Sequence, residues 1–345
     1  MTDVYWDDKK CGIAIQLPDS KTIGRIGFRL AEMLNLHLVL EAHYHTSTLA
    51  AALDKSSETV SALRSLEHSV CRDLDHVIVF TEEDRSRWIE CSNCARDRVS
   101  IVPFGVNAPT EPIVGGRGGL AFLGNMYFEP NRRAVVRLAT ELLPRIRSQI
   151  PNTPCTVIGD IPGELRLLCA RSQIQVVGEM ESPTQHLSTA AIGVAPVSEG
   201  SGVRVKILSY IAAGLPVVTT SIGTEGISFP SVFAEDDIGS AVVRCLDIIQ
   251  CPQKYLPLIR QTQLILHDRH LWPAVAGSAV RAYQNILKRN RTVKIEAPKN
   301  CNREPMWIQE VIEKGRFPTQ GKVGQAPFRR GIATHRNNEV SYEQR

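Results

Sequence analysis

Long apolar runs are missing from this sequence of 345 residues, and none reaches the length needed to cross a membrane. The first ten residues, MTDVYWDDKK, also lack the apolar core of a secretion signal. Neither sign of charge is in large excess, since the formal net charge is only +4. A nucleic-acid-binding protein would concentrate basic residues on one face. We therefore predict a cytoplasmic protein that handles anionic substrates and binds no nucleic acid.

Signatures of disulfide, metal and common catalytic sites are absent as well. The nine cysteines are scattered and odd in number, which does not indicate a disulfide framework. Cys91 and Cys94 form one C-x-x-C, but we identify no partner motif for it and predict no metal site. The sequence shows no Walker loop, no dinucleotide-binding glycine motif and no Ser-His-Asp order. GGRGG at 115–119 precedes a strand, so we interpret it as a linker.

What the sequence does contain, from residue 119 to residue 287, is an alternation of apolar runs and amphipathic stretches. The runs that we interpret as strands are GLAFLG, CTVIG, IQVVG, IGVAPV and PVVTT. The stretches that we interpret as helices are 131–149, 164–171, 184–190, 203–213, 237–249 and roughly 255–287. This order predicts a doubly wound parallel sheet, whose ligands bind beyond the carboxyl ends of the strands. Four glycine loops fall there, at Gly124, Gly159, Gly178 and Gly200.

The remaining sequence suggests three further parts. Segments 36–45, 75–84 and 98–107 each contain a strand-like run, and we assign residues 1–107 to a smaller N-terminal domain. Residues 108–118, rich in proline and glycine, form the predicted linker to a domain at 119–289. Residues 290–345 are polar, and we predict a mobile, solvated tail with one short helix at 306–317.

The most informative segment is PVSEGSGVRVKILSYIAAGLPVVTTSIGTEGI, at 196–227. Gly200, Ser201 and Gly202 let the backbone turn tightly, and Val203, a further candidate for donor binding, begins the helix that follows. The amide groups of a helix N-terminus attract anions. Arg204 and Lys206 add two full positive charges there, so the segment predicts a diphosphate-binding site; the alternative is a surface pair of charges.

This segment resembles the donor-binding half of retaining glycosyltransferases of family 4, which have the GT-B architecture. The resemblance continues in GLAFLGNMYFEPNRRAVVRLATELLPRI, TVIGD and VVGEM, and covers roughly 118–288. The N-terminal segments resemble the closing part of the family's first domain, without its opening strand and glycine loop. The resemblance therefore implies an α/β fold with two Rossmann-like domains, of which the N-terminal, acceptor-side one is reduced and the C-terminal one binds the donor.

The resemblance also implies roles for single residues. Arg204 and Lys206 would stabilise the leaving diphosphate, and Glu199 would contact hydroxyls of the donor sugar, unless it is a solvated loop acid. Ser209 stands where the family carries a glutamate that clamps the ribose, so we expect weaker or altered nucleoside binding, or none. His43 or His45 would reach the donor sugar, although an ordinary polar histidine is an equal alternative for each.

Three further sites follow from the same resemblance. Gly124 and Asn125 would approach the diphosphate and sugar, or form a plain turn. The loop Gly178, Glu179 and Met180 would hold the nucleobase, largely through its backbone. Glu225 matches a family glutamate, although an acidic residue at a helix start would explain it equally well.

The predicted activity is transfer of a sugar from a nucleotide-sugar to an acceptor hydroxyl, with retention of anomeric configuration. The nucleotide-sugar is a substrate, and we predict neither a cofactor nor a metal. The acceptor is left open as a glycan, glycolipid or small molecule, as is peripheral membrane association; polysaccharide biosynthesis is a common setting. The alternative is a catalytically degenerate nucleotide-binding module or partner subunit, which Ser209 and the short N-terminal part favour. A sugar-nucleotide epimerase shares the fold, but its motifs do not match.

Overall fold

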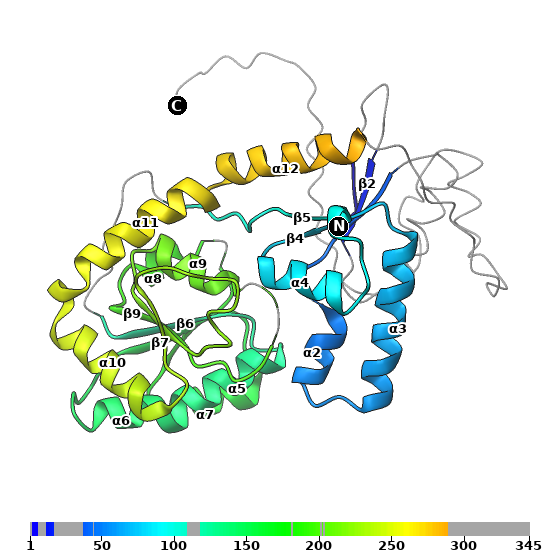
Figure 1. Cartoon of the computed structure of the whole chain (residues 1–345). Helices are drawn as coiled ribbons and strands as arrows, with labels where there is room; N and C mark the ends of the chain where they lie inside the picture. Colours follow the sequence, from blue (N-terminus) through cyan, green and yellow to red (C-terminus); the bar gives the residue numbers. More distant parts are fainter. Residues whose placement is uncertain are drawn as a thin grey trace, which may run out of the picture. The chain divides into compact units, whose positions relative to one another are not determined.

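The computed structural model describes residues 2–5, 12–16, 37–43, 45–108, 118–180, 182–200, 202 and 204–288. Two sheets, both covered by helices, lie within one compact unit, Met1–Ile295 (Figure 1). We call the first sheet with its helices the N-terminal lobe and the second the C-terminal lobe. The predicted α/β class is confirmed. Residues 109–117 of the predicted linker and the whole predicted tail lie outside the described residues, and the predicted domain boundaries stay predictions.

The C-terminal lobe contains six parallel strands in the order β11-β10-β9-β6-β7-β8. The strands are β6 (Leu120–Leu123), β7 (Cys155–Ile158), β8 (Gln175–Val177), β9 (Ile192–Ala195), β10 (Val217–Thr219) and β11 (Val232–Ala234). All five predicted strands are present. β11, an edge strand whose side chains are half-buried or exposed, was not predicted, because its apolar run is only three residues long.

Helices cover both faces of this sheet. They are α5 (Glu129–Arg137), α6 (Leu143–Arg147), α7 (Gly163–Arg171), α8 (Thr184–Leu187), α9 (Val205–Ala212), α10 (Ile238–Gln250) and α11 (Leu256–His270). A π-helical turn, Leu138–Leu142, joins α5 to α6. Along β6, Leu120 and Phe122 pack with α5, α6 and α10, whereas Ala121 packs on the other face with α9. This alternation is the pattern expected of a strand buried on both sides.

The predicted helical stretch at 255–287 is divided into two helices. α11 ends at His270, and α12 (Trp272–Leu287) begins after Leu271, whose backbone is extended with φ −71° and ψ 146°. Leu271 makes an isolated parallel bridge to Val106. Pro273 lies in the first turn of α12. Proline lacks an N–H donor, so it is tolerated at a helix start and not inside a continuous helix.

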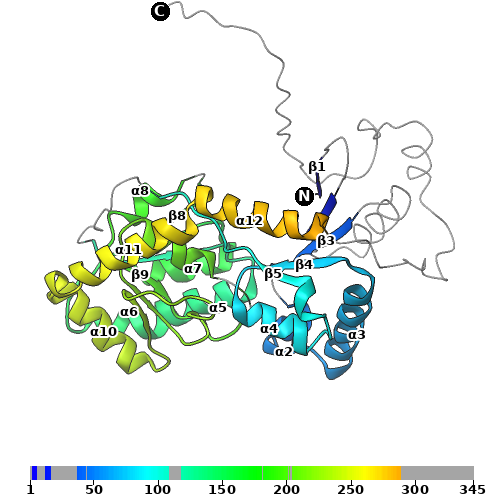
Figure 2. The same cartoon turned by 45° about the horizontal axis from the view of Figure 1, so that its top comes forward.

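α12 packs against the N-terminal sheet (Figures 1 and 2). Val275, Ala282 and Ile286 of this helix form a buried cluster with Val39 and Ile78 of β3 and β4. A helix inside the predicted C-terminal domain at 119–289 therefore contributes to the core of the N-terminal lobe.

The N-terminal lobe contains five strands in the order β1-β2-β3-β4-β5, and only β1 is antiparallel to its neighbour. Its elements are β1 (Thr2–Tyr5), β2 (Gly12–Gln16), β3 (His37–Glu41), α2 (Thr46–Ala52), α3 (Ser57–Asp73), β4 (His76–Val79), α4 (Glu82–Glu90) and β5 (Val99–Ile101). The three predicted strands are β3, β4 and β5. The sequence analysis expected no strand before them, whereas the structure has two; the sheet is nevertheless the smaller one. No helix among the described residues is long and apolar enough to span a membrane.

Candidate functional site

The order of the strands in the C-terminal lobe points to a ligand site at the ends of β6 and β9. The chain runs from β6 outward to β8 and then returns beside β6 as β9, from where it continues in the opposite direction. In doubly wound sheets, ligands bind at such a reversal, beyond the carboxyl ends of the strands. The residues there are Gly124 and Asn125 after β6, and the loop that leads from β9 to α9.

A tyrosine hydroxyl separates the ends of these two strands. β6 and β9 pair over only two residues each. Beyond that, the Tyr210 hydroxyl accepts a hydrogen bond from Leu123 N at 2.7 Å and donates one to Val194 O at 3.1 Å. Gly193 makes room for the ring, since a Cβ there would lie 2.4 Å from Tyr210 Cγ. The strands are thus held apart by a fully buried side chain directly below the candidate site.

Lys206 is the central charged group of the site. It lies in the first turn of α9, is half-buried, and has its Nζ 4.3 Å from the ring centroid of Phe122. Nζ donates a hydrogen bond to Asn131 Oδ1 at 2.5 Å, and among the described residues no carboxylate pairs with it. Burial, and secondly the charge of Arg204, lower the pKa of Lys206 to about 7. An ammonium group that is costly to charge in this way favours binding of an anion.

Arg204 provides the second cation, at the N-cap of α9. Its Nη1 donates to Gly202 O at 2.8 Å. Burial lowers the pKa of Arg204 to about 10, against the attraction of Asp84. The predicted tight turn is present: Gly200 has φ +130° and Gly202 has φ +81°, both in the region that favours glycine. Ser201 and Val203 lie outside the described residues.

Asn131 links the two sides of the site, and the sequence analysis missed it. Its Nδ2 donates to Asn125 O at 2.8 Å, while its Oδ1 accepts from Lys206. A Cβ at Gly124 would lie 2.9 Å from Asn131 Nδ2 and 3.2 Å from Lys206 Nζ, so a larger residue there would displace the ends of these two side chains. The available signal was a polar side chain in the first turn of the helix that follows the Gly124 loop.

Glu199 is buried, with 8% of the residue exposed, and lies beside α5. Its Oε2 accepts a hydrogen bond from Arg133 Nη1 at 2.8 Å. Its Oε1 has no hydrogen-bond partner among the described residues. Arg133, also missed from the sequence, is held in turn by Glu129 at 3.0 Å. One carboxylate oxygen is therefore fixed, and the other remains to accept a hydrogen bond from a ligand hydroxyl.

The residues predicted to hold the nucleoside lie on two separate elements, α9 and the loop after β8. Ser209 is half-buried, and its hydroxyl donates to Val205 O at 3.2 Å, one turn earlier in α9. Gly178 and Glu179 are exposed after β8, while Met180 packs against the core on the α9 side of the sheet. β7 separates this loop from β6.

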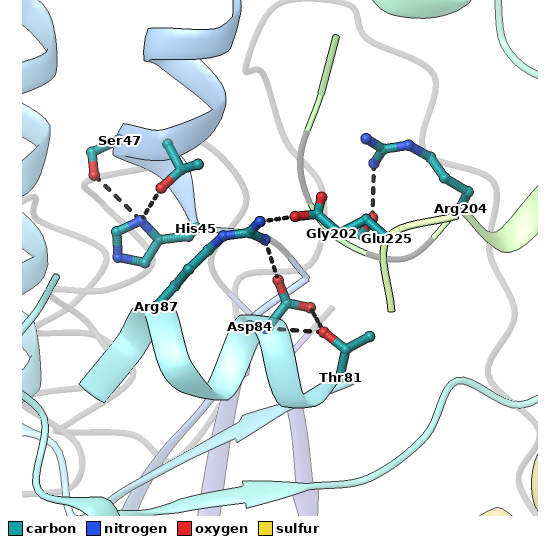
Figure 3. Close-up of polar contacts among 9 residues, drawn as sticks. His45, Ser47, Thr81, Asp84, Arg87, Gly202, Arg204 and Glu225 are labelled. Carbon is teal, nitrogen blue, oxygen red and sulfur yellow. Dashed lines mark hydrogen bonds and ion pairs between the residues drawn. The ribbon is translucent and has the colours of Figure 1, made fainter. Parts of the chain in front are cut away.

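The three predicted residues that remain occupy different surroundings. His45 is completely buried in the N-terminal lobe, where its ring nitrogens hydrogen-bond with Thr48 Oγ1 at 2.9 Å and Ser92 Oγ at 2.8 Å. Burial lowers its pKa, against the attraction of the Glu67 carboxylate, whose Oε2 lies 3.4 Å from Nε2. His43 is half-buried, with its ring against Phe80 at 5.1 Å between centroids, and burial lowers its pKa too. Glu225 forms an ion pair with Arg87 of α4 (Figure 3).

The C-x-x-C motif does not form part of this arrangement. Cys94 is buried in the core of the N-terminal lobe, and Cys91 is half-buried at the end of α4. Within the described residues, no group of three or more His, Cys, Asp or Glu side chains is placed to hold a metal ion. The predictions that no metal and no cofactor take part stay predictions.

Comparison with known proteins supports the assignment of the fold. Residues 117–247 match the family model described as glycosyl transferases group 1. The chain is similar to pneumococcal O-GlcNAc transferase GtfA in complex with UDP and GlcNAc (identity 14%, TM-score 0.60, 79% of this chain and 57% of that chain). It is also similar to Anabaena HepE in complex with UDP and glucose (12%, 0.62, 79% and 77%). A third is sucrose-phosphate synthase from Thermosynechococcus elongatus (16%, 0.60, 77% and 72%). No curated protein sequence matches.

The chain covers only part of some of these longer proteins. The chain spans 57% of the pneumococcal enzyme and 51% of S. aureus TarM, another similar structure. At identities of 10% to 16%, the similarity is one of fold. The two observed sheets, parallel except for β1, agree with the GT-B architecture of these neighbours, as the sequence predicted. Residues 117–247 therefore match the glycosyl transferases group 1 model, and the chain has the α/β GT-B fold of these neighbours.

Proposed function

We propose that this chain is a retaining glycosyltransferase that binds the diphosphate of a nucleotide-sugar at the ends of β6 and β9. The observation that supports this best is the half-buried ammonium group of Lys206, with a pKa near 7 and no carboxylate partner among the described residues. A diphosphate would supply the missing negative charge. Arg204 and the first amides of α9 would face the same anion.

The same groups suit the chemistry of transfer. As the bond between the sugar and the diphosphate breaks, negative charge develops on the leaving phosphate oxygen, and fixed cations stabilise it. In the front-face route implied by the resemblance, the acceptor oxygen bonds to the anomeric carbon on the side that the diphosphate leaves. The acceptor proton passes to the leaving phosphate oxygen. Glu199 would hold a donor hydroxyl through its second oxygen.

Uridine is the first base to test. The structures of pneumococcal GtfA and Anabaena HepE both contain UDP, together with GlcNAc and glucose respectively. In this chain the base would lie near Gly178, Glu179 and Met180. The acceptor is a glycan, glycolipid or small molecule, and we propose a cytoplasmic role in polysaccharide biosynthesis, with peripheral membrane association open.

A second candidate function is a nucleotide-binding subunit without catalysis. Ser209 favours it, because its hydroxyl is used within α9 and offers no carboxylate to a ribose. One similar structure is a complex of GtfA and GtfB, with TM-score 0.59 and 13% identity. Such a subunit would still bind the nucleotide but would depend on a partner for turnover.

Release of nucleoside diphosphate from UDP-, GDP- and ADP-sugars separates these functions. The glycosyltransferase releases UDP, Lys206→Ala abolishes the release, and NMR of the product shows the donor's anomeric configuration. Lys254→Ala is the matched control, since Lys254 is exposed and paired with Asp247, and it keeps the wild-type rate. Nucleotide binding without release would favour the subunit, and a full rate in Lys206→Ala would refute the site.

A further inference from the structure

Helix α4 of the N-terminal lobe contacts the loop that follows β10 in the C-terminal lobe. Arg87 of α4 forms an ion pair with Glu225 of that loop (Figure 3). The two side chains are half-buried, with 22% and 20% exposed, so salt screens this pair less than a fully exposed one. The contact thus joins two segments far apart in the sequence.

A second carboxylate lies one turn earlier in α4. Asp84 has 1% of the residue exposed; it accepts a hydrogen bond from Thr81 Oγ1 at 2.8 Å and one from Arg87 Nη1 at 3.3 Å. Burial raises the pKa of this carboxyl, against the hydrogen bond from Thr81. Arg87 is therefore held between two carboxylates, one on its own helix and one from the C-terminal lobe.

Arg204 belongs to the same electrostatic cluster. Among the charges that act on its guanidinium, Asp84 attracts and raises its pKa, whereas Arg87 repels and lowers it. Figure 3 shows Arg204 on the C-terminal lobe and Asp84 and Arg87 on α4, with Glu225 between them. The positive and negative groups of the two lobes thus act on one another at the N-terminus of α9.

The backbone of the loop after β10 approaches the side chain of Thr81 closely at the same place. Thr81 caps α4, accepting a hydrogen bond from Asp84 N at 3.0 Å. Gly226, directly after Glu225, has φ +69°, and a Cβ added there would lie 2.2 Å from Thr81 Cγ2. Only glycine permits this approach, so the loop after β10 is shaped for contact with the start of α4.

We propose that α4 is a positioning element of the donor site, resting on the function proposed above. Arg87 fixes Glu225 and the loop that carries it. Asp84 holds Arg87 toward that loop through the hydrogen bond between them. Neither Asp84 nor Arg87 needs to touch the donor, because both act through Glu225 and its loop. Removal of Arg87 leaves the buried Asp84 and the half-buried Glu225 without their shared cation, which frees the loop.

A double-mutant cycle tests the coupling. Arg87→Gln and Glu225→Gln should each weaken UDP binding by about tenfold, and the double variant should be no weaker than either single one, because both remove the same ion pair. Arg87→Lys keeps the charge and should recover part of the affinity. Arg85→Gln is the matched control: Arg85 lies on the same helix and pairs only with Glu82 of α4 among the described residues. It should leave UDP binding unchanged.

Hydrogen exchange of the unliganded chain provides a readout that needs no nucleotide. Amides of the loop at 220–226 should lose protection in Arg87→Gln and keep it in Arg85→Gln, while thermal melting shows that both variants are folded. Additive losses in the cycle, or unchanged UDP affinity and hydrogen exchange in Arg87→Gln, would overturn the positioning role of α4 and leave the proposed function standing. If the wild type binds no UDP, GDP or ADP, the proposed function fails first, and the positioning role fails with it.

Discussion

The pH dependence of nucleotide binding is the sharpest consequence of the buried lysine. Burial lowers the pKa of Lys206 from 10.5 to about 7, so in the unliganded protein about half of the Lys206 side chains are charged near neutral pH. A diphosphate favours the charged form and should raise that pKa again. Binding then takes up one proton at Lys206 whenever the pH lies above about 7.

The magnitude follows from linkage. If the diphosphate restores the ordinary value of 10.5, the Kd for UDP rises about fiftyfold between about pH 7 and about pH 9. The diphosphate contributes little in this window, because its last phosphate pKa is near 6. Partial recovery of the pKa gives a smaller slope of the same sign.

Calorimetric titration with UDP over this pH range measures the effect, and titration in buffers of different ionisation enthalpy counts the proton. Lys206→Arg is the control, since arginine stays charged throughout and should give a flat profile. A wild-type Kd that is constant between about pH 7 and about pH 9, with no proton uptake, would refute the argument.

Three further predictions concern stability and are checked by chemical denaturation. Tyr210→Phe should cost roughly 2–3 kcal/mol, because it leaves Leu123 N and Val194 O without their hydrogen-bond partner. Tyr255→Phe should cost less, since the Tyr255 hydroxyl bonds to the partly exposed Asp247. Equal losses in the two variants would contradict this. Lys206→Met should stabilise the unliganded chain by about 1–3 kcal/mol while abolishing UDP binding. A loss of stability would contradict the claim that charging Lys206 costs free energy in the unliganded fold. Arg133→Met should destabilise the chain, because it leaves the Glu199 carboxylate buried and unpaired. Arg132→Met, at an exposed pair, should be near neutral, and an equal loss in the two variants would contradict this.

Much of the C-terminal sheet could be predicted because its strands are continuous apolar runs separated by amphipathic helices. The glycine turn before α9 could be predicted as well, since Gly200 and Gly202 need backbone conformations that other residues disfavour. The break between α11 and α12 could not, because it depends on a bridge from Leu271 to Val106, a contact distant in sequence. Pro273 was the only local signal.

The candidate site was predicted in part for the same reason. Lys206 follows a recognisable motif, whereas its partner Asn131 lies 75 residues away in the sequence and carries no motif of its own. His45 has the residue type of a site histidine, but its burial and hydrogen bonds are properties of the fold. Arg87 of α4 likewise becomes a candidate only once Glu225 is seen to pair with it.

The central claim is that a nucleoside diphosphate binds at Lys206, and calorimetric titration of the wild type and Lys206→Ala with UDP tests it most directly. The wild type should bind UDP at one site, Lys206→Ala should show no detectable binding, and Lys254→Ala should bind as the wild type does. Equal UDP affinity in wild type and Lys206→Ala, or no binding of UDP, GDP or ADP by the wild type, would contradict it.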